Sequence, residues 1–205
     1  LSNANSETIN ALCTLLKNQY MIATDKIMPY QFDLANEVLI NEFNSQQSRL
    51  ISQALLKGYE IALPNLAEIL QGNNLVICDV SGSMWMQSGR LRVEGRNTPY
   101  TSLSGDKALL IASTIAKATN ADIIRFGGTA EYVNYNPNQD VFTLARSMKK
   151  DMGSTKLAAA WELATKSNRK YDRVFILSDN ECNRGNNAQA YKNYVNKLGD
   201  PYVYS

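Results

Sequence analysis

The sequence predicts an α/β protein with a doubly wound, mostly parallel sheet, preceded by a small helical segment. From about residue 71 onward, short apolar runs alternate with amphipathic helical patterns, which is typical of parallel strands joined by helices. Before that point the apolar residues recur only at helical spacing. In addition, Asp79 directly follows the apolar run 75–78, where a buried strand of such a sheet would end.

Composition limits the classes of function. The 205 residues are 44% apolar and 20% charged, as in ordinary soluble globular chains. The net charge of +2 gives no whole-domain attraction to nucleic acid or a membrane, so any such partner must use a local patch. The sequence contains no histidine, which excludes the Ser/His and Cys/His nucleophilic pairs and most zinc chemistry.

The cysteines favour a reducing compartment. They are odd in number, show no C-x-x-C spacing, and lie at Cys13, Cys78 and Cys182. Cys78 fits a small buried hydrophobe. No apolar run reaches the length of a membrane span. We therefore expect a cytoplasmic protein without a membrane partner.

The first part of the chain reads as helices. Residues 1–4 resemble the remnant of a cleaved expression tag, and 5–70 form the helical segment. One helix is expected at 7–24, a second at 30–41 opened by Pro29, and a third at 45–62 ended by Pro64.

Strands and helices alternate in the remainder, 71–205. The expected strands are 75–78, 122–126, 131–135, 173–177 and one beginning at 202, and the expected helices are 105–119, 141–149, 156–167 and 188–198. Ser104 is expected to cap the first of these helices, and Gly127-Gly128 turns the chain into an antiparallel edge strand. Because the sequence stops inside a strand pattern, we expect the domain to continue beyond Ser205.

Oxygen-bearing side chains follow two of the predicted strands. Asp79, Ser81 and Ser83 follow the first strand, Asp179 follows the strand 173–177, and Thr155 lies just before a helix. The carboxyl ends of parallel strands meet at one edge of a sheet, so two carboxylates and three hydroxyls are expected around one point. A hard cation, Mg²⁺ or Mn²⁺, is the expected occupant.

A purely structural interpretation remains for these residues. Ser81 and Ser83 could only turn the chain, and Asp179 could only cap a helix, since Ser and Asp favour both positions. Asn180 and Glu181 have two open interpretations, contact with the metal or stabilisation of their own loop.

The set Asp79, Ser81, Ser83, Thr155 and Asp179 resembles the metal-ion-dependent adhesion site of the von Willebrand factor A fold, in the same chain order. The resemblance implies that Ser81 and Ser83 bind the metal directly and that Thr155 joins in the ligand-bound state. It implies that the two aspartates act mainly through waters or as alternate ligands. Mostly neutral ligands leave Mg²⁺ short of negative charge, so such a site captures a carboxylate or phosphate oxygen.

Three further stretches resemble the Ro autoantigen family, whose members join a TROVE domain of helical repeats to a von Willebrand A domain. They are 26–32 (KIMPYQF), 51–59 (ISQALLKGY) and 177–181 (LSDNE). The resemblance implies that 5–70 are the end of a TROVE domain and that 71–205 are the A domain. In that family the helical ring binds small noncoding RNAs and the ends of misfolded RNAs. Most of the ring lies outside these residues, so RNA binding is expected of the longer parent protein.

The predicted function is a non-catalytic, divalent-metal-dependent binding module of a Ro-like ribonucleoprotein. The alternative is a metal-dependent protein–protein adhesion or assembly domain with no RNA role. A metal-dependent hydrolase is disfavoured, because the sequence has no phosphate-binding loop and no G-x-S-x-G elbow. Ser81 also stands where a phosphatase of the haloacid dehalogenase type needs a second aspartate.

Two groups of basic residues have alternative interpretations. Arg90, Arg92 and Arg96 lie in a predicted long loop, 85–103, where they could attract an RNA phosphate near the metal or simply be solvated. A second group follows a predicted helix, where cations complement the helix dipole without any partner. Its members are Lys166, Arg169, Lys170 and Arg173.

Overall fold

The computed structural model describes residues 5–43, 45–86, 90–93, 96–99, 104–180 and 184–205. The chain forms two compact units, Leu1–Leu70 and Gln71–Ser205. None of the described helices combines the length and the apolar character that a membrane span requires.

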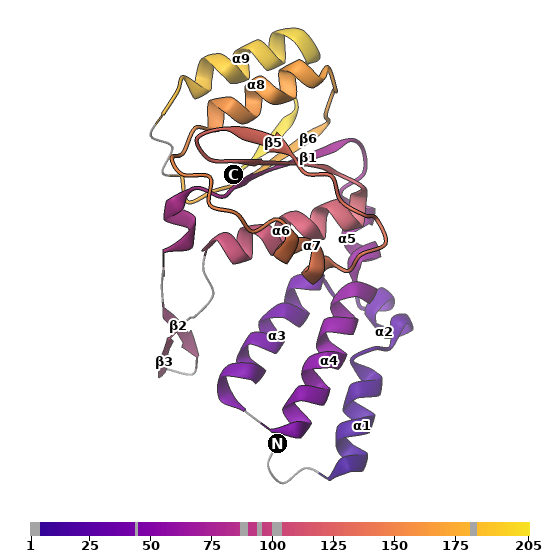
Figure 1. Ribbon diagram of the computed structural model, residues 1–205. Coiled ribbons are helices and arrows are strands. Elements are labelled where there is room, and N and C mark those ends of the chain that lie inside the picture. The colour runs from indigo at the N-terminus through magenta and orange to yellow at the C-terminus, as the bar shows by residue number, and fades with distance from the viewer. Residues whose placement is uncertain (1–4, 44, 87–89, 94–95, 100–103, 181–183) are drawn as a thin grey trace. The chain divides into compact units, whose positions relative to one another are not determined.

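The N-terminal unit is helical (Figure 1). Its helices are α1 (Ser6–Leu15), α2 (Gln19–Thr24), α3 (Pro29–Glu42), α4 (Gln46–Ile61) and α5 (Leu63–Ile69). Helix α4 contacts the other four and supplies much of the core. A Cβ atom at Gly58 of α4 would lie 2.3 Å from the Phe32 ring and 2.5 Å from the Leu16 carbonyl oxygen. Glycine at this position therefore lets α3 and α4 approach closely.

One prediction for this unit is wrong. The single helix expected at 7–24 is two helices, because the Asn18 side chain accepts a hydrogen bond from the Met21 N–H and starts α2. The third expected helix ends before Pro64, since α4 stops at Ile61. The helix α5 that follows was not predicted, and Pro64 lies in its first turn, where a missing N–H costs no helical hydrogen bond.

The C-terminal unit contains a five-stranded sheet in the order β5-β4-β1-β6-β7. Its strands are β1 (Asn74–Asp79), β4 (Asp122–Phe126), β5 (Ala130–Tyr132), β6 (Arg173–Leu177) and β7 (Tyr202–Tyr204). Only the β4–β5 pair is antiparallel; β1 pairs in parallel with β4 and β6, and β6 pairs in parallel with β7. The predicted mixed α/β fold class and the antiparallel edge strand are confirmed.

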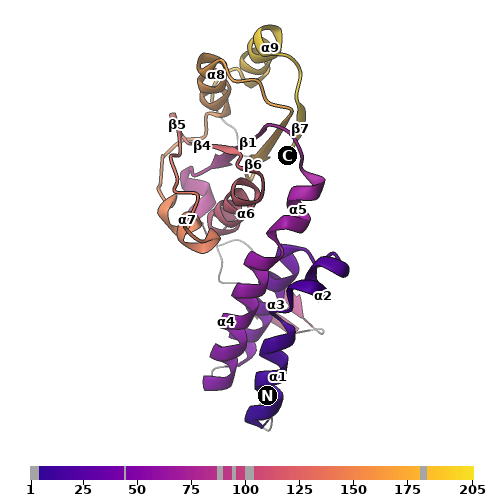
Figure 2. The ribbon, with the colours of Figure 1, turned by 90° about the vertical axis from the view of Figure 1, so that its right-hand side faces the viewer.

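Helices cover both faces of this sheet, as Figures 1 and 2 show. One face carries α6 (Ser104–Thr119) and α7 (Val141–Ser147), and the other carries α8 (Leu157–Ser167) and α9 (Asn187–Leu198). All six residues of the central strand β1 are consequently buried. Trp161 of α8 lies in the core, with its ring centroid 4.9 Å from that of Tyr191 and 5.4 Å from that of Tyr194.

The region predicted as one long loop after β1 contains secondary structure. A 3₁₀ helix, η1 (Gly82–Trp85), comes first, and an antiparallel pair follows, β2 (Arg90–Val93) with β3 (Arg96–Pro99). The four-residue strands carry too short a pattern for the sequence to reveal. The dipeptide Glu94-Gly95 between them is the missed signal, since a two-residue connection containing glycine is typical of hairpins.

Candidate metal centre

The connections of the sheet diverge at the adjacent strands β1 and β6. The chain leaves β1 toward α6 on one face, and it leaves β6 toward α9 on the other. Adjacent strands whose connections diverge in this way form a ligand-binding crevice at their carboxyl ends. Cys78 pairs with Leu177 in the register of these strands, so Asp79 and Ser178 are neighbours at this end of the sheet.

Asp79 is the last residue of β1, and its side chain is fully buried. Its Oδ1 accepts a hydrogen bond of 2.8 Å from the Ser81 backbone N–H, and its Oδ2 accepts one of 2.6 Å from the Ser178 hydroxyl. Both donors are neutral. Among the described residues, no ion pair involves Asp79. A buried carboxylate without a cation is costly, so this position favours an added positive charge.

Two hydroxyls follow this carboxylate in sequence and lie beside each other. The Oγ atoms of Ser81 and Ser83 are 3.3 Å apart, Ser81 is fully buried and Ser83 is half-buried. The turn into η1 brings them together, with Ser81 as the residue that precedes the 3₁₀ helix. They offer a pair of neutral oxygen atoms of the kind that Mg²⁺ accepts as ligands.

The loop that carries Thr155 is fixed against the loop after β1 by backbone hydrogen bonds. The Met152 N–H donates to the Val80 carbonyl at 2.9 Å, and the Gly82 N–H donates to the Gly153 carbonyl at 2.9 Å. Thr155 itself is buried, with 3% of its surface exposed. The structure thus places the segments of Asp79, Ser81, Ser83 and Thr155 side by side at one edge of the sheet.

A third loop, which follows β4, is hydrogen-bonded to the loop that carries Thr155. The Gly128 N–H donates to the Met152 carbonyl at 2.8 Å. A Cβ atom at Gly127 would lie 2.5 Å from both the carbonyl oxygen and the Cβ of Met152. Gly127 therefore has a packing role beyond the turn expected from the sequence, because any side chain there would push the Thr155 loop away.

Asp179 follows β6 one residue after Ser178, and its side chain is exposed. The Asn180 N–H donates to the Ser178 hydroxyl at 3.1 Å, and Asn180 adopts a left-handed conformation with φ of 62°. Glu181 lies outside the described residues. For Arg90, Arg92 and Arg96 the structure gives only their backbone positions in β2 and β3.

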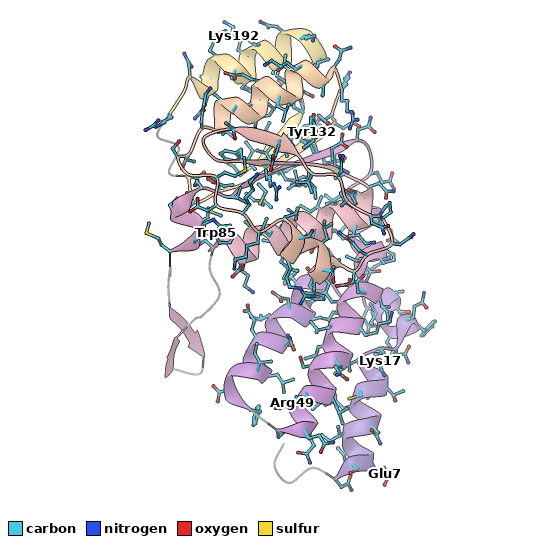
Figure 3. All side chains as sticks on the ribbon, in the orientation of Figure 1. Glu7, Lys17, Arg49, Trp85, Tyr132 and Lys192 are labelled. Carbon is cyan, nitrogen blue, oxygen red and sulfur yellow. The ribbon has the colours of Figure 1, made fainter. Side chains whose placement is uncertain are left out.

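Trp85, at the end of η1, anchors the hydroxyl-bearing turn to α6 (Figure 3). Its indole N–H donates to the Val80 carbonyl at 3.4 Å, and its ring occupies the space beside Gly105, where a Cβ atom would lie 2.7 Å from the ring. The Lys149 Nζ lies 5.1 Å from the ring centroid and pairs with Asp106 at 2.9 Å. Trp85 was not among the predicted site residues.

Cys78 contributes no thiolate to this centre. Burial raises the pKa of its thiol, and the neighbouring charge of Asp79 raises it further. The predicted role of Cys78 as a small buried hydrophobe agrees with its zero exposure. In the described part of the chain, no group of three or more His, Cys, Asp or Glu side chains could hold a metal ion. A metal at this edge would depend on hydroxyl ligands.

Comparison with known proteins gives structural matches alone. No protein-family model and no curated protein matches the sequence. The crystal structure of the RO (RSR) protein of Deinococcus radiodurans matches with a TM-score of 0.75 and 19% identity. The D319A mutant of the PilB minor pilin from Streptococcus sanguinis aligns over 52% of this chain and 29% of that chain, with 20% identity and a TM-score of 0.29, which is too low to support an argument.

The match to the Deinococcus Ro structure covers 99% of this chain and 42% of that chain. At 19% identity it shows the fold alone. The chain therefore has a Ro-like fold and spans less than half the length of the Ro structure that it resembles.

Proposed function

We propose that the α/β unit is a non-catalytic binding module that depends on a divalent metal, Mg²⁺ or Mn²⁺. The observation that carries the proposal is Asp79, whose fully buried carboxylate accepts hydrogen bonds from two neutral donors and has no ion pair among the described residues. Buried charges that persist in proteins are paired with an opposite charge or coordinate a metal. At the carboxyl end of a sheet, followed by two serine hydroxyls in sequence, Asp79 would have a metal ion as this partner.

The ligands of the metal would be the hydroxyls of Ser81 and Ser83, with Thr155 joining when an external ligand is bound. Asp79 and Asp179 would act through water molecules or as alternate ligands. Because most of these groups are neutral, the bound ion keeps an affinity for one more anionic oxygen. The site would thus capture an acidic protein side chain or an RNA phosphate.

The Ro-like fold supports an RNA-binding context for the parent protein. We propose that the parent is a cytoplasmic ribonucleoprotein that binds noncoding RNA mainly through helical repeats beyond those described, and that this unit contributes the metal-dependent contact. The absence of histidine, the commonest general base, supports a binding role over a catalytic one.

Metal-dependent stabilisation tests the proposal. A metal that binds only the folded state at 100 times its Kd adds about 2.7 kcal/mol to the free energy of unfolding. Mg²⁺ or Mn²⁺ should therefore raise the melting temperature of the wild type, and Asp79→Ala should abolish the rise. An equal rise in both proteins would show that the metal binds elsewhere.

Titration with RNA tests the ribonucleoprotein context. This chain alone should bind single-stranded RNA weakly, with an affinity that falls steeply as salt increases, because any contact would be with phosphates. Tight binding that is insensitive to salt would place the main RNA site within these residues. Binding of an acidic peptide at the metal, with no binding of RNA, would instead favour a protein-assembly domain.

A phosphatase or phosphodiesterase assay with Mn²⁺ tests the non-catalytic assignment. No turnover is expected, because the chain has no histidine, the commonest general base. Turnover that disappears in Asp79→Ala would contradict the proposal.

A further inference from the structure

Ser178 joins two parts of the candidate metal centre through one oxygen atom. Its hydroxyl donates to Asp79 Oδ2 at 2.6 Å and accepts from the Asn180 N–H at 3.1 Å. Asp79 ends β1, whereas Asn180 belongs to the loop after β6, which also carries Asp179. The hydroxyl therefore connects the buried carboxylate at the end of β1 with the backbone next to Asp179 in the loop after β6.

The hydrogen bond that Ser178 donates differs from the one donated by a serine in a similar turn elsewhere in the chain. Ser167 makes a similar turn, in which its hydroxyl accepts from the Arg169 N–H at 3.3 Å. The Ser167 hydroxyl, however, donates to the carbonyl of Ala164 in the preceding turn of α8. Ser178 donates instead to a charged group 99 residues away in sequence. A hydrogen bond to a carboxylate is about twice as strong as one between neutral groups.

We infer that Ser178 is a positioning residue for metal binding, which orients the Asp79 carboxylate and couples it to the loop of Asp179. The inference rests on the proposed function. With Oδ1 held by the Ser81 N–H and Oδ2 held by Ser178, the carboxylate plane is fixed on both sides. A carboxylate has about four lone-pair sites, so two remain to face a metal or its waters.

Without the Ser178 hydroxyl, the carboxylate rotates more freely, since the terminal torsion of Asp is soft. The Asn180 N–H also loses its acceptor, which loosens the left-handed turn beside Asp179. Both effects weaken metal binding. Outer-shell partners of metal ligands typically contribute a factor of 10 to 100 in affinity.

The test is the Kd of Mn²⁺ for the whole chain, measured well below the melting temperature by the electron paramagnetic resonance signal of free Mn²⁺. Ser178→Ala should raise this Kd roughly 10- to 100-fold. Ser178→Thr retains a hydroxyl at the same position and should return the Kd close to the wild-type value. Ser167→Ala is the matched control. It removes the serine hydroxyl of the similar turn at the C-terminal end of α8 and should leave the Kd unchanged.

A double variant tests the coupling. If Ser178 positions the loop of Asp179, the rise in Kd of Ser178→Ala with Asp179→Asn should fall short of the product of the two single rises. Circular dichroism of the metal-free variants shows that each is folded before the titration.

The outcomes separate the two proposals. If the wild type binds no Mn²⁺, the proposed function fails, and this inference fails with it. If the wild type binds Mn²⁺ and Ser178→Ala binds it equally well, the metal centre stands and the positioning role is wrong. If Ser178→Thr fails to restore Mn²⁺ binding, the positioning role is also wrong. If the rise in Kd of the double variant equals the product of the two single rises, the coupling to Asp179 is wrong.

Discussion

Two aspartates lie at opposite strand ends of the same sheet, which we call the Asp79 edge and the Asp122 edge. Only Asp122 has a cationic partner among the described residues. Asp122 begins β4, and its Oδ2 accepts hydrogen bonds from the Arg169 guanidinium at 2.7 Å and from the Tyr171 hydroxyl at 2.6 Å. Asp79 ends β1 and has two neutral donors. Asp122 is also partly exposed, with 32% of its side chain accessible, whereas Asp79 is fully buried.

The more deeply buried carboxylate is thus the one for which the described chain provides no cation. At the Asp122 edge a positive side chain comes from the chain itself, and the aspartate has a structural role. One consequence is visible in Tyr171, where burial and then the hydrogen bond to Asp122 raise the pKa of the hydroxyl. At the Asp79 edge we propose that the cation is a metal ion supplied from outside.

Substitution of each aspartate by asparagine should change the metal-free stability in opposite directions. Asp79→Asn removes a buried charge without a cation and should raise the free energy of unfolding by about 2 kcal/mol. Asp122→Asn keeps an oxygen that can accept both hydrogen bonds but removes the negative charge that pairs with Arg169, and should lower it by about 1 to 2 kcal/mol. Urea unfolding in the presence of a chelator measures both. A loss of stability in Asp79→Asn equal to that in Asp122→Asn would remove the distinction between the two edges.

Substitutions at two glycines near Asp79 should have different effects on the free energy of unfolding in urea. Gly127→Ala forces a Cβ atom against the Met152 backbone and should destabilise the protein by about 1 to 3 kcal/mol, with weaker Mn²⁺ binding. Gly82→Ala should change the stability by less than about 0.5 kcal/mol, because the nearest atoms to its Cβ lie at 3.9 Å. Equal effects at both positions would mean that the close approach of Gly127 to Met152 has no energetic role.

Removal of the cation at the other edge should have a smaller effect. Arg169 is 59% exposed on its side chain, and exposed ion pairs contribute about 0 to 1 kcal/mol. Arg169→Gln should therefore lower the stability by less than about 1 kcal/mol, mainly at low salt, and leave the metal-dependent rise in melting temperature unchanged. A variant that lost the metal response would show that the two edges are coupled.

The smallest expected effect is a pH dependence at Glu131 of β5. Hydrogen bonds from Lys150 and then Arg125 lower the pKa of this carboxyl below its usual value near 4.5. The unfolded chain then binds the proton more readily, so the contribution of Glu131 is present above its unfolded pKa and is lost as the pH falls through its folded pKa. The melting temperatures of wild type and Glu131→Gln should converge in acid. If the difference in melting temperature between the two proteins grew as the pH fell, the assignment of a lowered pKa to Glu131 would be wrong.

The sequence predicts the sheet well where strands are central and apolar. The expected strands 122–126 and 173–177 coincide with β4 and β6, and β1 differs by one residue at each end. These runs are continuous because both faces are buried, so the pattern is strong. The hairpin of β2 and β3 and the break before α2 were missed, because four-residue strands and a single cap leave little periodic signal.

The residues of the candidate site also differ in how far the sequence predicts them. Asp79, Ser81, Ser83, Thr155 and Asp179 could be named from the sequence, since each follows a strand or precedes a helix at a recognisable place. Ser178 could not be assigned a role, because its contact with Asp79 depends on the register between β1 and β6. Register follows from packing across the sheet, and no local pattern in either strand specifies it.

The most direct test of a metal at the Asp79 edge is an anomalous diffraction measurement on crystals of the protein soaked in Mn²⁺. We predict an anomalous peak beside the hydroxyls of Ser81 and Ser83, facing Asp79, and no peak in crystals of Asp79→Ala. A wild-type crystal without a peak at this edge, or with its peak beside Asp122, would contradict the account.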